Sequence, residues 1–176
     1  MSVEGLIEAA RLTSTQRSVD WEQVQEHLAM TLPSDYRTLV EAGGAGLWFN
    51  DLRLYSPGDP VRFRDLTESD GVFEDLLLFW QDDPEFRPAD LPSDARFIAW
   101  ANTGHGETLF WRVDADNDTG EYPIYVEDGD GAHWERFDLS TTDLLLGILH
   151  ETVSSQLFSD LFMDAEQVFR PYTQQQ

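Results

Sequence analysis

The segment 114–121 carries carboxylates at alternate positions, a spacing that could bind a metal ion. It reads Asp-Ala-Asp-Asn-Asp-Thr-Gly-Glu, so Asp114, Asp116 and Asp118 lie two residues apart. Such a pattern suits Ca²⁺, which takes six to eight oxygen ligands. The calcium loop of helical calcium-binding proteins, however, needs Gly at its sixth position and Glu at its twelfth, where this chain has Thr119 and Tyr125. The sequence therefore favours a solvated hairpin tip over a calcium site.

Other residue types that support catalysis are scattered or missing. The four histidines lie at positions 27, 105, 133 and 150, with neither a His-x-x-x-His nor a His-Glu-x-x-His spacing. There is no Cys, no Gly-x-Ser-x-Gly and no phosphate-binding Gly-Lys-Ser/Thr. Only His105, within a Gly-His-Gly turn, is suggestive, and a role in shaping that turn is favoured over a catalytic base. We therefore expect no enzymatic activity, no metal and no cofactor.

Charge is the strongest compositional signal. The 176 residues include 34 acidic and 11 basic side chains, for a formal net charge of −23, and every basic residue is Arg. Codon bias or adaptation to salt would explain this balance, and so would a surface that binds a basic protein partner. Direct binding of nucleic acid requires a basic patch, which the sequence lacks. A partner that is a basic protein is therefore expected rather than DNA or RNA.

Seven carboxylates are the candidate partner-binding residues, and they fall on two neighbouring loops. They are Asp114, Asp116, Asp118, Glu121, Glu127, Asp128 and Asp130. Like charges this close repel one another and lower stability. Either they keep a very acidic chain in solution, or they complement a basic surface. In a regular antiparallel sheet the two loops leave opposite ends, so one loop, or the flat face between them, would make the contact.

The elements that position these loops begin with a short helix over 33–42. Pro33 suits the first turn, because it has a fixed φ and no N–H group. Tyr36, Leu39 and Val40 follow at helical spacing and form one apolar face. Gly43 and Gly44 supply the positive φ that ends the helix. We expect this helix to pack against a sheet.

The second half of the chain predicts that sheet. Apolar and aromatic runs at 96–101, 107–113, 122–127 and 133–137 alternate with turns rich in Gly and Asp. This spacing predicts four adjacent antiparallel strands. Further elements are expected as a hairpin of 47–49 with 52–55 and as helices at 3–11, 20–29, 71–81 and 140–150, the last with a capping box of Ser140 and Asp143. The helix at 71–81 should bury a broad apolar band against the sheet, made of Phe73, Leu76, Leu77, Leu78, Phe79 and Trp80. The tail should pack back through Leu157, Phe158, Leu161, Phe162, Val168 and Phe169. The prediction is one α+β domain over 1–176, a twisted, mainly antiparallel sheet with helices packed on it.

Membrane and secretion signals are not visible in the sequence. There is no run of 18 apolar residues, and the N-terminus lacks a charged segment followed by an apolar core. The absence of Cys excludes disulfides and thiolate metal sites. We expect a soluble, cytoplasmic protein with no membrane partner.

The order of motifs resembles the SUKH superfamily over residues 20–150. The resemblance is carried by a Trp before a Leu-Pro-x-x-Tyr helix with a Gly-rich end, a Gly-x-Gly-acidic turn before a strand, and a closing acidic helix. The matching residues are Trp21, Pro33, Tyr36, Gly43, Gly44, Gly104, Gly106 and Glu107. The family's turn often has Asp where this chain has Glu107, and residues 151–176 match no motif of the family.

This resemblance implies an α+β fold and a binding function without catalysis. The superfamily contains immunity proteins of bacterial polymorphic toxin systems, which often neutralise a nuclease or deaminase toxin inside the producing cell, and a fungal cell-wall assembly regulator. The leading hypothesis is therefore an immunity protein for a cognate toxin. The alternatives are an intracellular regulatory scaffold that docks a cellular protein and, more remotely, a hydrolase that uses carboxylates and His105.

Overall fold

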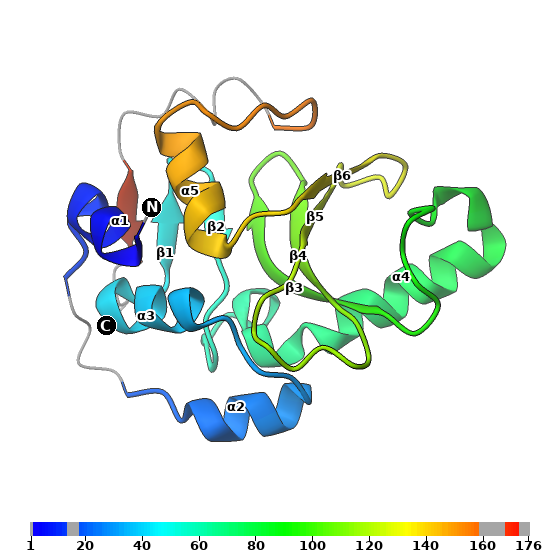
Figure 1. The fold of residues 1–176 in the computed structure, drawn as a ribbon, viewed down its shortest axis with the longest axis horizontal. Coiled ribbons are helices and arrows are strands. Elements are labelled where there is room, and N and C mark those ends of the chain that lie inside the picture. The colour runs from blue at the N-terminus through cyan, green and yellow to red at the C-terminus, as the bar shows by residue number, and fades with distance from the viewer. Residues whose placement is uncertain (1, 14–17, 159–167, 173–176) are drawn as a thin grey trace.

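The computed structural model describes residues 2–13, 18–158 and 168–172 (Figure 1). They form five α-helices and a seven-stranded antiparallel sheet, so the predicted α+β class is confirmed. The helices are α1 (Val3–Ala10), α2 (Trp21–Leu28), α3 (Ser34–Gly43), α4 (Asp70–Asp82) and α5 (Thr141–Leu149). The strands are β1 (Gly46–Trp48), β2 (Leu52–Leu54), β3 (Arg96–Thr103), β4 (Thr108–Val113), β5 (Ile124–Glu127), β6 (Trp134–Phe137) and β7 (Phe169–Pro171). Short 3₁₀ turns span Arg62–Arg64, Leu66–Glu68 and Pro84–Phe86.

The order of strands in the sheet is their order along the chain, except at one edge. Its strand order is β6-β5-β4-β3-β2-β1-β7, and every neighbouring pair is antiparallel. The predicted meander of the last four long strands and the predicted hairpin of β1 with β2 are thus confirmed. Strand β7 returns from the C-terminal segment to pair with β1, placing Pro171 opposite Gly46.

Alternation of side chains along β3 and β4 gives the sheet two covered faces. Phe97 is paired with Arg112, so it lies on the face opposite to Trp111. On the Trp111 side, the ring of Tyr36 from α3 lies 4.9 Å away and edge-on. On the Phe97 side, Phe73 and Trp80 from α4 lie at 6.0 and 6.3 Å between ring centroids. Figure 1 shows α4 passing behind the sheet, with α1, α3 and α5 in front.

Helix α3 forms the centre of the packing in front of the sheet. Tyr36, Leu39 and Val40 are buried, as their spacing predicted. The Tyr36 hydroxyl donates a 2.6 Å hydrogen bond to the carbonyl oxygen of Tyr55, and burial raises the pKa of this phenol well above its usual value. Only Gly44, with φ of 68°, takes the positive φ that ends the helix. The prediction for Gly43 is wrong, because Gly43 is still helical.

Helix α4 differs from the sequence prediction in how it is buried. Its apolar residues predicted a broad band covered by the sheet, yet Leu77 is 43% exposed and Leu78 is 60% exposed. Phe73 and Trp80 contact Phe97, so one side of the helix faces the sheet. A helix that rests on a sheet through one side leaves its other side in solvent. The prediction that Leu77 and Leu78 are buried is therefore wrong.

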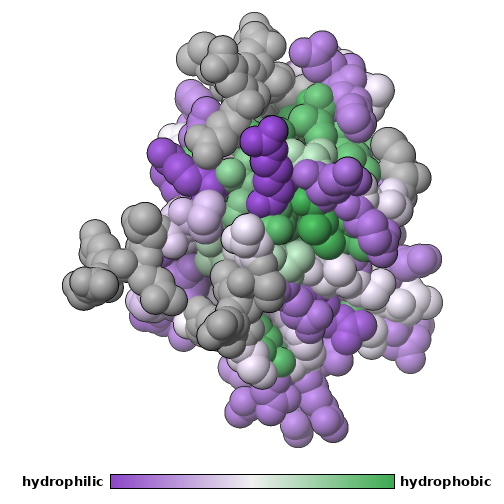
Figure 2. All heavy atoms as spheres, turned by 90° about the vertical axis from the view of Figure 1, so that its left-hand side faces the viewer, coloured by the Kyte–Doolittle hydropathy of each residue, from purple (hydrophilic) through white to green (hydrophobic). Residues whose placement is uncertain are grey.

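The tail packs on the domain where the structure describes it. Phe158 and Phe169 are buried, as predicted. Leu161 and Phe162 fall outside the described residues. Figure 2 shows the side that carries α1 and β7, where apolar surface lies between hydrophilic residues. Among the described segments, no helix is long and apolar enough to cross a membrane.

Candidate functional site

Antiparallel pairing places the two predicted acidic loops at opposite ends of the sheet. Because successive turns of a meander alternate between its ends, the 114–123 loop lies at one end and the 128–133 turn at the other. The 49–51 and 104–107 turns share the end of the 128–133 turn. The segment 138–140, which leads from β6 into α5, shares the end of the 114–123 loop.

The 114–123 loop presents some of its carboxylates to solvent and uses one internally. Arg112 donates two hydrogen bonds to Asp114, each 3.0 Å long, so this charge is offset by an ion pair. Asp116, Asp118 and Glu121 are exposed. The loop is anchored from its far side by Tyr122, whose hydroxyl donates a 2.8 Å hydrogen bond to the carbonyl oxygen of Thr31.

The carboxylates at the other end largely shape their own turn. Glu127 is only 7% exposed, and it accepts a 2.8 Å hydrogen bond from the backbone N–H of Gly131. Burial raises the pKa of the Glu127 carboxyl. Asp128 accepts hydrogen bonds from Asp130, Ala132 and His133; burial alone would raise its pKa, but these bonds outweigh burial and lower it. Of the three carboxylates predicted at this turn, Glu127, Asp128 and Asp130, it is Asp130 that is exposed and available to a partner.

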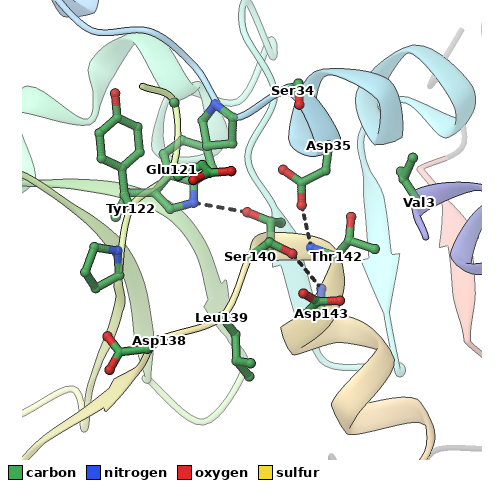
Figure 3. A pocket seen from close by; sticks show the side chains of 15 residues that line it. Val3, Ser34, Asp35, Glu121, Tyr122, Asp138, Leu139, Ser140, Thr142 and Asp143 are labelled. Atoms are coloured by element: carbon green, nitrogen blue, oxygen red, sulfur yellow. Dashed lines mark hydrogen bonds between the residues drawn. The ribbon is translucent and has the colours of Figure 1, made fainter. Parts of the chain in front are cut away.

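A pocket of about 540 Å³ opens beside the 114–123 loop (Figure 3). Four carboxylates line it, those of Asp35, Glu121, Asp138 and Asp143, whereas no Arg or His does so within the described part of the chain. The rest of the lining is made of small polar and apolar residues: Val3, Pro33, Ser34, Trp111, Gly120, Tyr122, Pro123, Leu139, Ser140, Thr141 and Thr142. The pocket thus borders the loop that also carries the exposed Asp116 and Asp118.

Two helices begin at this pocket and are tied together there. Asp35, in the first turn of α3, accepts a 2.7 Å hydrogen bond from the backbone N–H of Thr142 in α5. Ser140 caps α5 by accepting a 3.0 Å bond from the N–H of Asp143, as its spacing predicted. The indole N–H of Trp111, another lining residue, donates a 3.1 Å hydrogen bond to the Thr141 hydroxyl. These bonds fix the pocket wall, so its shape is set before anything binds.

The opposite end contains a histidine–carboxylate pair that the sequence did not reveal. Nδ1 of His105 lies 2.7 Å from Oδ2 of Asp51, which raises the pKa of His105. Oδ1 of the same carboxylate accepts a hydrogen bond from the backbone N–H of Gly104. Asp51 lies 54 residues before His105, so only the pairing of β2 with β3 brings them together.

The side chains around the Asp51–His105 pair have a structural role. The Thr103 hydroxyl accepts a hydrogen bond from the backbone N–H of His105, is buried, and donates a hydrogen bond to the buried Glu107. Gly106 adopts a φ of 107°, which favours Gly at this turn position. Asp51, Thr103 and Glu107 therefore hold the 104–107 turn in shape. Among the residues that the structure describes, no group of three His, Asp or Glu side chains is arranged to hold a metal ion.

The remaining motif residues line the packing between α2 and α3. Trp21 is half-buried, and its indole N–H donates a 2.6 Å hydrogen bond to Glu41. Its ring lies 6.1 Å from that of Tyr36 in an edge-on contact. Trp21 thus anchors α2 against α3 from a half-buried position. Pro33 occupies the cap position immediately before α3 and also lines the pocket.

Comparison with protein-family models, with curated proteins and with solved structures finds no match to this chain.

Proposed function

We propose that this chain is a non-catalytic protein-binding module, an immunity protein that neutralises a basic toxin domain, such as a nuclease or deaminase, in the cytoplasm of the cell that makes it. The observation that carries the proposal is the cluster of carboxylates at the end of the sheet that holds the 114–123 loop. There Asp116, Asp118 and Glu121 are exposed beside a pocket lined by four carboxylates and, within the described chain, by no basic residue. The resemblance of the motif order to the SUKH superfamily supports the same function.

Charge explains how such a surface would act. The carboxylates of this loop would take the place of phosphates in the basic groove of an enzyme that cleaves nucleic acid. Their field steers the partner into place and raises the association rate, mainly at low salt. Asp114 contributes less to this field, because Arg112 offsets its charge. The contact surface we propose is therefore formed by Asp116, Asp118, Glu121 and the pocket, which we call the acidic end.

A growth assay tests this function. An open reading frame beside this gene that encodes a large secreted protein with a variable C-terminal domain would supply the toxin. Expression of that domain alone should arrest growth, and co-expression of this chain should restore it. If the domain is toxic and this chain neither restores growth nor binds it, the immunity function is wrong. A binding partner of housekeeping function would instead support the regulatory scaffold.

The Asp51–His105 pair is the observation that favours a hydrolase, the second candidate. An imidazole held by a carboxylate can act as a general base. His105→Asn tests this role, because it removes the base from an exposed position. Loss of a hydrolytic activity in this variant, with unchanged growth protection, would support the hydrolase; unchanged protection without any hydrolysis supports the binding module.

A further inference from the structure

The pocket at the acidic end contains a polar atom with no partner. Thr142 is 3% exposed, and its hydroxyl oxygen makes no hydrogen bond to any described residue. Thr142 lines the pocket next to Asp35 and Ser140 (Figure 3). A buried hydroxyl without a partner destabilises a fold by about 1–3 kcal/mol, and a bound water or ligand is one way to satisfy it. Because Thr142 is part of the pocket wall, a hydrogen-bond donor that enters the pocket and reaches this hydroxyl would satisfy it.

The charges that line the pocket determine whether it suits an anionic or a cationic group. The N-termini of α3 and α5 favour an anion, but Asp35 and the Ser140 hydroxyl already accept hydrogen bonds there. Asp138 is paired with Arg136, at 2.8 Å. Asp35, Glu121 and Asp143 form no ion pair with any basic side chain in the described part of the chain. The pocket is thus net negative, and it suits a cation.

The shape and lining of the pocket determine which basic side chain fits it best. Trp111, Tyr122, Pro33, Pro123 and Leu139 give the pocket apolar walls alongside its carboxylates. Such walls cover the aliphatic stem of a long basic side chain while its charged head reaches the acids. A planar guanidinium also stacks on aromatic rings and binds carboxylates through two parallel hydrogen bonds, which an ammonium cannot do. The lining thus favours Arg over Lys.

We propose that the pocket is the anchor site for an arginine side chain of the partner. This inference rests on the proposed function and adds to it the contact that fixes the partner after electrostatic steering. The guanidinium would lie between Glu121 and Asp143, and the Thr142 hydroxyl would accept one of its N–H groups. A buried Arg in a preformed pocket is a frequent energetic centre of protein interfaces.

The test uses a fragment in place of the partner. N-acetyl-arginine amide is titrated into ¹⁵N-labelled protein, with the citrulline amide as a neutral analogue of equal shape and the lysine amide as a second cation. The arginine fragment should saturate with a dissociation constant of about 1–10 mM, as expected for a ligand of this size. The largest amide shifts should fall at residues 120–123 and 140–143. The citrulline fragment should not saturate in that range.

Two variants separate this site from general attraction to an acidic protein. Thr142→Val keeps the shape but removes the hydroxyl, and it should weaken arginine binding about 2- to 10-fold, the worth of one hydrogen bond. Its unfolding midpoint should stay equal or rise, because an unpartnered buried hydroxyl is lost. Glu121→Gln, at an exposed position, should also weaken binding. Asp130→Asn removes the same charge at the opposite end and should leave binding unchanged.

Several results would overturn the pocket proposal without touching the proposed function. These are equal shifts with arginine and citrulline, shifts spread over all acidic surfaces, or an unchanged dissociation constant for Thr142→Val and Glu121→Gln. If the protein fails these tests but protects growth, the arginine anchor is wrong and the immunity function is not contradicted. If it binds arginine but gives no protection, the pocket proposal holds and the immunity function is contradicted.

Discussion

At the scale of single residues, Tyr36 links α3 to both the sheet and the 52–56 segment. Its ring packs edge-on against Trp111, and its hydroxyl binds the Tyr55 carbonyl. Tyr36→Ala should lower the free energy of unfolding by about 3–5 kcal/mol, because it leaves a cavity in a fully buried site. Urea denaturation measures this change. An unfolding midpoint equal to that of the wild type would show that Tyr36 does not lie in the core.

Tyr36→Phe separates the hydrogen bond from the ring. This variant keeps the aromatic contact with Trp111 but leaves the Tyr55 carbonyl without its donor. We expect a loss of about 1–2 kcal/mol, smaller than that for the Ala variant. Equal losses in the two variants would mean that the hydroxyl, and not the ring, carries the effect.

The buried carboxyl of Glu127 should make the folding stability depend on pH. Its folded pKa is raised above the ordinary value of 4.5, first by burial and then by the neighbouring Asp128 and Asp130. Folding therefore favours the protonated form, and this favourable contribution is lost as the pH rises from about 4.5 through the folded pKa. Glu127→Gln mimics the protonated form, so its melting temperature should exceed that of the wild type at pH 7.

Melting curves between pH 4 and 7 test this sign. The advantage of Glu127→Gln should shrink toward pH 4, where the wild-type carboxyl becomes protonated. Asp116→Asn, an exposed residue at the other end, removes the same charge and serves as the control. An advantage that is constant with pH, or equal to that of the control, would contradict the assigned role of burial.

At the scale of elements, the β1–β7 edge depends on one close approach. A Cβ atom on Gly46 would lie 2.3 Å from the ring of Phe169 and 2.7 Å from the carbonyl oxygen of Arg170. Gly46→Ala should therefore destabilise the protein by about 1–3 kcal/mol. Gly71→Ala, in α4, is the matched control, because nothing lies within 4 Å of its added Cβ. It should stabilise by about 0.5–1 kcal/mol through helix propensity.

Denaturation of these two variants checks the pairing of β7. Hydrogen exchange at the amide of Phe49, which donates to the Val168 carbonyl, reports on the same edge. Faster exchange there in Gly46→Ala, with the centre of the sheet protected, is the expected result. A Gly46→Ala variant as stable as Gly71→Ala would show that β7 does not pack at this edge.

The elements also show what sequence alone can predict. Period-two alternation and Gly-rich turns predict β3 to β6, and Ser140 predicts the start of α5, because these signals are local. Strand β7 has three residues, one of them Pro171, so no periodicity reveals it. The Asp51–His105 and Asp35–Thr142 contacts join residues 54 and 107 positions apart. Such contacts depend on the register of the sheet and on helix docking, which a single sequence does not state.

The candidate site was predictable only in part for the same reason. The acidic loops are visible as runs of Asp and Glu, but their exposure is not. The structure buries Glu127 and pairs Asp114 with Arg112. It adds Asp35, Asp138 and Asp143 to the end that holds Glu121, through the pocket. These three residues come from α3 and from the region before and within α5, and no motif in the sequence connects them.

At the scale of the whole molecule, a formal charge of −23 sets how the protein meets a partner. Charges more than about 8–10 Å apart are screened at physiological salt, so only local clusters direct a partner at short range. The acidic end combines such a cluster with a preformed pocket, whereas the opposite end exposes Asp130 and uses Glu127 and Asp128 within its own turn. We therefore expect the acidic end, rather than the net charge, to determine how fast the proposed partner associates.

Association rates across a salt series show whether the acidic end directs binding. The variant Asp116→Asn/Asp118→Asn is compared with Glu74→Gln/Asp75→Asn, which removes two exposed charges of α4 on the other face of the sheet. Each is mixed with the toxin domain that the proposed function requires, taken from an open reading frame beside this gene. The first variant should associate about 3- to 10-fold more slowly at low salt, with a shallower salt dependence and an unchanged melting temperature. The second should keep the wild-type rate. Equal rates for both variants and the wild type at every salt concentration would show that Asp116 and Asp118 do not direct binding.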